Sequence, residues 1–224
     1  MLKIKTFFIA AIATLFVGSA MAETISMGIT GSIVGYEANG EEKLKSSAKI
    51  TTASETGAAP VASLFIEVDN GDGIIGLDII PYGAKIGDGS TTDTATGDKA
   101  AADNTVDVNF NKAVMLYVET PADIPLISNY GTTYMKFGVQ ALTLETDENL
   151  GTGSTYEDET MVGVHFGVGT KGDLGDGFYK VDLMVARYNG AEFAGSLDAD
   201  GVGNTITLDD LTTAALRFSV GRSF

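Results

Sequence analysis

The sequence has no cysteine and no tryptophan, only 4 prolines, and 14 Lys and Arg residues against 30 Asp and Glu residues. Without cysteine, the chain can form neither a disulfide framework nor a thiolate metal site. The net charge of −16 argues against nucleic acid as a partner, because few cations could neutralise phosphates. Scarce proline, 28 glycines and the lack of helical periodicity together favour an all-β protein.

The first 22 residues have the three parts of a secretory signal peptide. Lys3 and Lys5 form a basic start, residues 7–18 form an apolar run, and residues 20–22 have the small-x-small pattern of a cleavage site. Beyond residue 22, no apolar run approaches the roughly twenty residues that a membrane-spanning helix needs. We therefore predict a signal peptide over residues 1–22 and a single exported domain over residues 23–224.

Eight segments of that domain alternate apolar with small or polar residues at a period of two, which predicts strands with two different faces. These segments are residues 24–36, 61–68, 73–82, 106–119, 130–142, 161–171, 178–188 and 211–224. Three connections, "DNGDG", "PADIPLISN" and "GDLGDG", are short. They alternate with four long ones, residues 38–60, 83–104, 145–160 and 189–211.

This alternation is typical of an outer-membrane barrel, which has short periplasmic turns and longer extracellular loops. The sequence thus predicts an all-β, eight-stranded antiparallel up-and-down transmembrane β-barrel with four long extracellular loops and both termini periplasmic. A soluble secreted β-sandwich, which would bind calcium or glycan through its loops, also alternates. It is disfavoured because the charges lie mainly in the loops and because a Greek key would break the short–long order.

The last strand presents four apolar side chains on one face: Leu216, Phe218, Val220 and Phe224. In this pattern the chain resembles the small eight-stranded outer-membrane barrels, namely the OmpA-like transmembrane domain and the opacity-type, porin-like proteins. The resemblance implies the outer membrane of a Gram-negative bacterium and recognition of these four residues by the barrel-assembly machinery. Arg222 departs from the family pattern, in which an aromatic residue is usual at that position.

Tryptophan is missing from the aromatic girdles that such barrels carry at the membrane interfaces. Tyrosine and phenylalanine can take the same amphipathic position. We expect the periplasmic belt to consist of Tyr117, Tyr130, Tyr179 and Phe224.

The faces opposite the apolar ones would line the lumen and carry several charges. The candidate lumen charge network is Glu67, Asp78, Lys136, His165, Lys180, Asp182 and Arg217. Acids and bases buried together should pair, and an eight-stranded barrel is just wide enough for side chains to fill. We expect a closed lumen; the alternative is a narrow, cation-preferring, porin-like channel. His165 has glycine two residues on and no nucleophile in its pattern, so no enzyme activity or cofactor is predicted.

The loops 145–160 and 189–211 are acidic and contain no Lys or Arg. They could hold divalent cations against lipopolysaccharide phosphates. A weaker hypothesis is a specific calcium site at Asp198, Asp200 and Asp209, although no flanking helices accompany it. The expected partners are outer-membrane lipid, lipopolysaccharide and the assembly machinery, and the expected role is structural, in membrane integrity and loop-mediated surface contacts.

Overall fold

The computed structural model describes residues 24–43, 50–93, 102–149, 155–196 and 205–224. In chain order the elements are β1 (Thr24–Lys43), β2 (Ile50–Asp69), β3 (Ile74–Ile80), β4 (Ala84–Asp93), β5 (Ala102–Pro121), the 3-10 helix η1 (Ser128–Tyr130), β6 (Thr132–Asn149), β7 (Glu159–Leu174), β8 (Gly177–Tyr188), β9 (Ala191–Ala194) and β10 (Thr205–Ser223). No helix in these ranges is long and apolar enough to cross a membrane. The predicted signal peptide lies outside them and stays a prediction.

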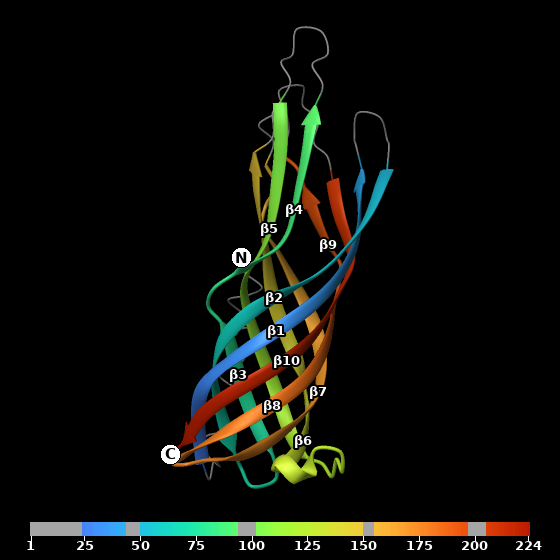
Figure 1. Ribbon diagram of the computed structural model, residues 1–224. Helices are drawn as coiled ribbons and strands as arrows, with labels where there is room; N and C mark the ends of the chain where they lie inside the picture. The colour runs from blue at the N-terminus through green and yellow to red at the C-terminus, as the bar shows by residue number, and fades with distance from the viewer. Residues whose placement is uncertain (1–23, 44–49, 94–101, 150–154, 197–204) are drawn as a thin grey trace.

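Eight of the strands form a closed antiparallel ring. Their order is β1, β2, β3, β5, β6, β7, β8 and β10, and β10 returns to pair with β1. Figure 1 shows the strands winding around the barrel at a steep tilt, with the C-terminus at the end where the short connections lie. The predicted eight-stranded barrel is therefore confirmed.

Closure depends on the full length of the last strand. Its register with β1 runs from Ser223 opposite Ser26 to Thr205 opposite Lys43. The N–H of Phe224 donates to the carbonyl oxygen of Ile25 at 2.8 Å, so pairing continues to the last residue. A ring closed in this way leaves the barrel wall without the unpaired backbone groups of an open sheet edge.

Two further strands, β4 and β9, continue the barrel wall beyond β3 and β8 respectively. After residues 81–83, β5 pairs with β4 in place of β3. The register of β5 against β6 shifts between Phe110 and Lys112. In the same way, β9 pairs with β10 after β8 has ended. The wall of the barrel thus extends beyond β3 and β8 into taller hairpins (Figure 1).

The three short connections are confirmed, and the first of them shows how its sequence forms the turn. The side chains of Asp69 and Asn70 accept hydrogen bonds from the N–H groups of Gly71 and Gly73 at 2.9 and 3.0 Å. Gly71 has φ of 86°, a conformation that other residues rarely adopt. The turn chemistry of "DNGDG" therefore fixes the register of β2 against β3.

The four long connections are shorter than predicted, because strand residues continue into each of the predicted loops. The residues predicted as the first loop, 38–60, form a regular ladder in which Lys43 lies opposite Ile50. Small and polar residues such as Ala53, Ser54 and Thr56 carry no apolar alternation. Strand pairing in this segment rests on backbone hydrogen bonds, so the strand continues where the periodicity has stopped.

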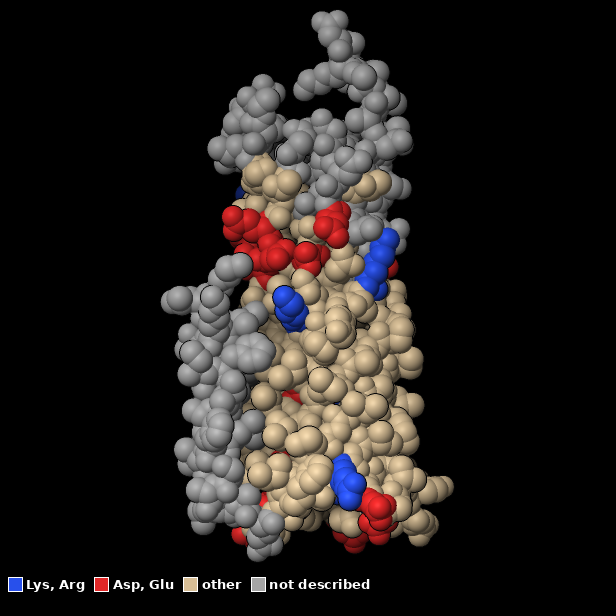
Figure 2. Space-filling view, turned by 90° about the vertical axis from the view of Figure 1, so that its left-hand side faces the viewer, with Lys and Arg blue, Asp and Glu red and all other residues tan. Residues whose placement is uncertain are grey.

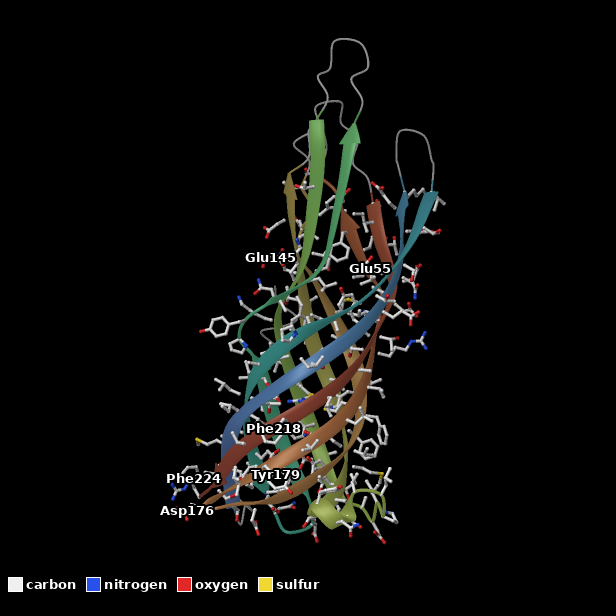
Figure 3. The ribbon with its side chains drawn as sticks, in the orientation of Figure 1. Glu55, Glu145, Asp176, Tyr179, Phe218 and Phe224 are labelled. Carbon is white, nitrogen blue, oxygen red and sulfur yellow. The ribbon has the colours of Figure 1, made fainter. Side chains whose placement is uncertain are left out.

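The outer wall carries an apolar belt. It includes large apolar side chains that are about half exposed or more, among them Ile29, Ile33, Leu64, Val118, Val164, Leu183, Leu216 and Phe218. Figure 2 shows a wall that is mostly uncharged over its middle, with charged side chains at its two ends. Figure 3 places Phe218 on the middle of the wall, between Asp176 and Phe224 at one end and Glu55 and Glu145 at the other. Such a belt suits contact with lipid.

Candidate functional site

Alternation along each strand sends the charged residues of the wall into the lumen. On β8, Asp182 and Met184 are 1% and 5% exposed, whereas Leu183 between them is 58% exposed. The same period of two buries Glu67 on β2 and Lys136 on β6. Because the apolar partners of this alternation face outward, the polar residues have only the interior left to occupy.

The lower part of the lumen contains an unbroken series of ion pairs, here called the charge network: Glu67, Lys180, Glu119, Lys136 and Asp182. Lys180 contacts Glu67 and lies 2.8 Å from Oε2 of Glu119. Lys136 lies 2.8 Å from Oε1 of Glu119 and 3.4 Å from Oδ2 of Asp182. Each side chain is at most 3% exposed, so the network crosses the interior from β2 through β8, β5 and β6.

Two tyrosines complete this layer. The hydroxyl of Tyr117 donates to Oε1 of Glu67 at 2.7 Å, and that of Tyr134 donates to Oδ1 of Asp182 at 2.6 Å. The ammonium of Lys136 lies 4.4 Å from the centre of the Tyr117 ring, within the range of a cation–π contact. The predicted interfacial position of Tyr117 is therefore wrong, because its outward neighbours leave it facing the lumen at 2% exposure.

The other members of the predicted aromatic belt do face outward or lie at the rim. Tyr130 and Phe224 are 65% and 70% exposed. The hydroxyl of Tyr179 donates to the carbonyl oxygen of Tyr130 at 2.5 Å. Figure 3 places Tyr179 and Phe224 at the end of the barrel that carries the short connections, and Tyr130 belongs to η1 in one of those connections.

Above the charge network, a separate ion pair spans the lumen. Arg217 on β10 contacts Asp78 on β3, and both side chains are buried. The Nη1 of Arg217 also lies 3.5 Å from the sulfur of Met184 and 3.7 Å from that of Met115. Arg217 and the two methionines together form a floor across the barrel.

His165 stands apart from these ion pairs. It is 5% exposed on β7, and neither ring nitrogen has a hydrogen-bond partner in the described part of the chain. Its ring lies over Gly138, where a Cβ would come within 2.5 Å of the imidazole Cε1. Glycine at that position is what lets the imidazole lie flat against the wall.

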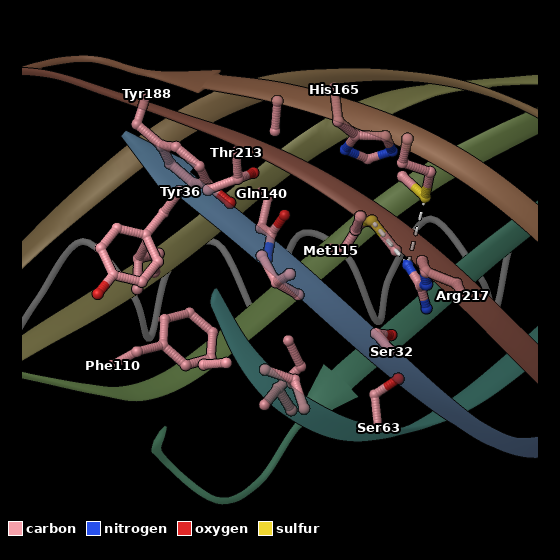
Figure 4. A pocket seen from close by; sticks show the side chains of 18 of the residues that line it. Ser32, Tyr36, Ser63, Phe110, Met115, Gln140, His165, Tyr188, Thr213 and Arg217 are labelled. Carbon is pink, nitrogen blue, oxygen red and sulfur yellow. Dashed lines mark hydrogen bonds between the residues drawn. The ribbon is translucent and has the colours of Figure 1, made fainter. Parts of the chain in front are cut away.

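A cavity of about 90 Å³ opens above the Arg217 floor (Figure 4). Its wall is largely apolar, with Val34, Val61 and Leu142 among the lining residues. His165 and Ser63 also line it. Beyond it, inward-facing apolar side chains such as Phe193 and Met161 form a core cluster. The upper lumen is therefore more apolar than the lining of small and polar side chains that the alternation predicted.

Sequence reasoning missed Glu119, the carboxylate that joins the two lysines. The alternation could have located it, because Glu119 directly follows Val118, which is exposed on the outer wall, and adjacent residues of a strand face opposite sides. With Glu119, the buried charged side chains of the described residues are four carboxylates and three bases. This buried set thus carries one more acid than base.

The remaining candidate residues lie on the surface or outside the described ranges. Asp198 and Asp200 of the calcium hypothesis fall in residues 197–204, and Asp209 is exposed on β10. No three metal-ligating side chains come together among the residues that the structure describes. The four apolar residues of the last strand share its outward face: Leu216, Phe218, Val220 and Phe224.

Comparison with solved structures shows which known proteins have a similar fold. The outer membrane protein OprG from Pseudomonas aeruginosa aligns over 90% of this chain and 96% of its own, with a TM-score of 0.53 and 12% sequence identity. The attachment invasion locus protein Ail of Yersinia pestis, solved with a heparin analogue, covers 88% of this chain and 99% of its own at 13% identity, with a TM-score of 0.37. The protease OmpT from Escherichia coli covers 88% and 97% at 10% identity, with a TM-score of 0.44.

No protein-family model matches the sequence, and no curated protein matches it. The similarity to OprG is therefore a similarity of fold, and the other two structures are too distant to add to it. By its fold the protein is a small eight-stranded outer-membrane β-barrel.

Proposed function

We propose that the protein is a non-conducting outer-membrane barrel with a structural and surface-interaction role. The observation that supports this is the charge network, whose buried ion pairs connect opposite walls of the lumen. The Arg217–Asp78 pair adds a second barrier above it. An ion crossing the barrel would have to displace both layers, and breaking buried ion pairs is costly.

Planar-bilayer recording tests the closed lumen. We expect the purified full chain to leave bilayer conductance at the level of the lipid alone. Regular current steps from the heat-modifiable, folded form would contradict the proposal. An exposed-site variant, Lys112→Met, serves as the preparation control because it lies on β5 outside the charge network.

A narrow cation-preferring channel is the second candidate, and the excess carboxylate in the lumen favours it. If current steps are seen, Glu119→Gln should reduce the preference for cations, because it removes one of the four lumen carboxylates. An unchanged preference would assign selectivity to the acidic outer residues instead. The presence or absence of current steps separates the two candidate functions, and the Glu119→Gln result then locates the source of selectivity.

We propose that the chain is exported by its first 22 residues and assembled with both termini in the periplasm, its last strand being recognised by the assembly machinery. Lipid would surround the apolar belt. The acidic outer hairpins would meet lipopolysaccharide phosphates through divalent cations. Catalysis forms no part of the proposal, because His165 makes no hydrogen bond to a nucleophile within the described residues.

Cell fractionation followed by a gel of unheated and boiled samples tests this location. We expect the protein in the outer-membrane fraction, with a mobility that changes on boiling, because a closed barrel stays folded in unheated detergent. Recovery as a soluble periplasmic protein without such a change would contradict membrane insertion and revive the soluble sandwich alternative.

A further inference from the structure

The cavity above the Arg217 floor is a cup with a closed bottom. Arg217 is held there by Asp78 and by the sulfur atoms of Met115 and Met184. The side walls come from strands on every side of the barrel, and most of the lining side chains are apolar. Above the cup lies the buried apolar cluster that includes Phe193 and Met161. A molecule in the cup would therefore be enclosed between apolar side chains and the polar floor.

Buried polar atoms without partners gather around this cup. In the described residues, the side chains of the lining include four such atoms: Oγ of Ser63, Nε of Arg217 and both ring nitrogens of His165. A buried donor or acceptor without a partner lowers stability, so native structures seldom leave several together. Their concentration at one cavity points to a ligand that supplies the missing hydrogen bonds.

The charges of the lumen restrict the ligand. Four carboxylates against three basic groups disfavour an anion, and the Arg217 guanidinium at the floor disfavours a cation. A neutral imidazole offers one donor and one acceptor. A hydroxyl group offers the same pair, and it can therefore satisfy His165 without bringing charge into the barrel.

The size of the cup restricts the ligand further. Its volume of about 90 Å³ is smaller than the roughly 150 Å³ apolar cavity that binds benzene in another protein. The space therefore suits a molecule smaller than benzene, such as a short-chain alcohol, rather than an aromatic ring or a lipid tail. The His165 ring would turn away from Gly138 to present a nitrogen to the occupant.

We propose that the cup binds a small uncharged molecule with an apolar body and a single hydroxyl group. The apolar body lies among residues such as Val34, Val61 and Leu142, and the hydroxyl bonds to His165. This site lies above the charge network, and its occupancy does not depend on whether the barrel conducts. Recording conductance on the same preparations keeps the two proposals separable.

The single histidine of the chain makes the site directly observable. The full chain, labelled with ¹⁵N-histidine and placed in lipid nanodiscs, is titrated with 1-propanol and, separately, with 1-chloropropane, which replaces the hydroxyl by chlorine. We expect a saturable shift of the His165 imidazole signals with 1-propanol. The chloro compound should bind about tenfold more weakly, because it leaves the imidazole unpaired.

A cavity-filling variant locates the binding. Ala186 lies directly opposite His165 on the neighbouring strand and lines the cup, so Ala186→Leu should abolish the saturable shift. Ala62→Leu is the matched control, because Ala62 is exposed on the outer wall. Should Ala186→Leu fail the heat-shift test of folding, Ala59→Leu fills the cup from β2 instead.

Three outcomes would overturn the proposal. The first is no saturable shift with 1-propanol at any concentration that leaves the nanodisc intact. The second is an equal response to 1-propanol and 1-chloropropane, which would indicate partition into the surrounding lipid. The third is a shift that persists in the folded cavity-filling variant, which would place the bound alcohol elsewhere.

Discussion

Replacing Lys180 by Met is expected to lower the free energy of unfolding by about 3–5 kcal/mol, the usual cost of leaving buried charges without their partner. Lys180 is 1% exposed and contacts both Glu67 and Glu119. Methionine preserves most of the side-chain volume but removes the ammonium. Two carboxylates would then face each other across a space that water does not reach.

Urea-induced unfolding in lipid vesicles, followed by tyrosine fluorescence and the gel shift, measures this loss. Lys112→Met is the control, since it makes the same chemical change at an exposed position on β5. The control should change stability by less than about 0.5 kcal/mol, as surface substitutions usually do. Equal effects of the two variants would show that the network contributes nothing specific.

A second substitution tests the charge balance. Glu119→Gln leaves three carboxylates for three basic groups, so each base keeps one partner: Glu67, Asp182 or Asp78. Combined with Lys180→Met, it should recover part of the lost stability, with a coupling of about 0.5–3 kcal/mol as is usual for groups in contact. Strict additivity of the two changes would mean that Lys180 and Glu119 do not interact in the folded barrel.

Leu183→Arg is expected to lower stability in a lipid bilayer by about 2–4 kcal/mol, the cost of a basic residue on the lipid face of a barrel near the midplane. Leu183 belongs to the apolar belt and is 58% exposed. In water, an arginine at such an exposed position would cost almost nothing. The loss of stability in Leu183→Arg therefore shows whether lipid or water surrounds the outer wall of the barrel.

The matched control is Ser54→Arg, at an exposed position of β2 opposite Asn39 in the tall hairpin. Both variants are compared by urea unfolding in vesicles of the same lipid. We expect the hairpin variant to keep wild-type stability, because its side chain lies in water beyond the belt. Indifference of the barrel to Leu183→Arg would contradict lipid contact at this face.

The sequence by itself determined the fold class, because a period of two in eight segments predicts eight strands. In each strand, alternate side chains must face opposite sides of the sheet. It also assigned Glu67, Lys136, Lys180 and Asp182 to the interior, since their apolar neighbours required the other face. The turn at residues 69–73 could be predicted for a similar reason, because its Asp and Asn side chains bond to backbone N–H groups within the turn itself. All of these features arise from neighbours along the chain.

Only the tertiary structure decided which charges meet. Register between strands brings Lys180 on β8 to Glu119 on β5, two strands that share no backbone pairing, and nothing in either segment specifies that contact. The lengths of the outer hairpins could not be predicted either. Their strands are polar and show no apolar alternation, yet they remain paired through backbone hydrogen bonds. The cup beside His165 exists only where side chains of several strands stop short of one another, which is a property of the closed barrel and not of any one segment.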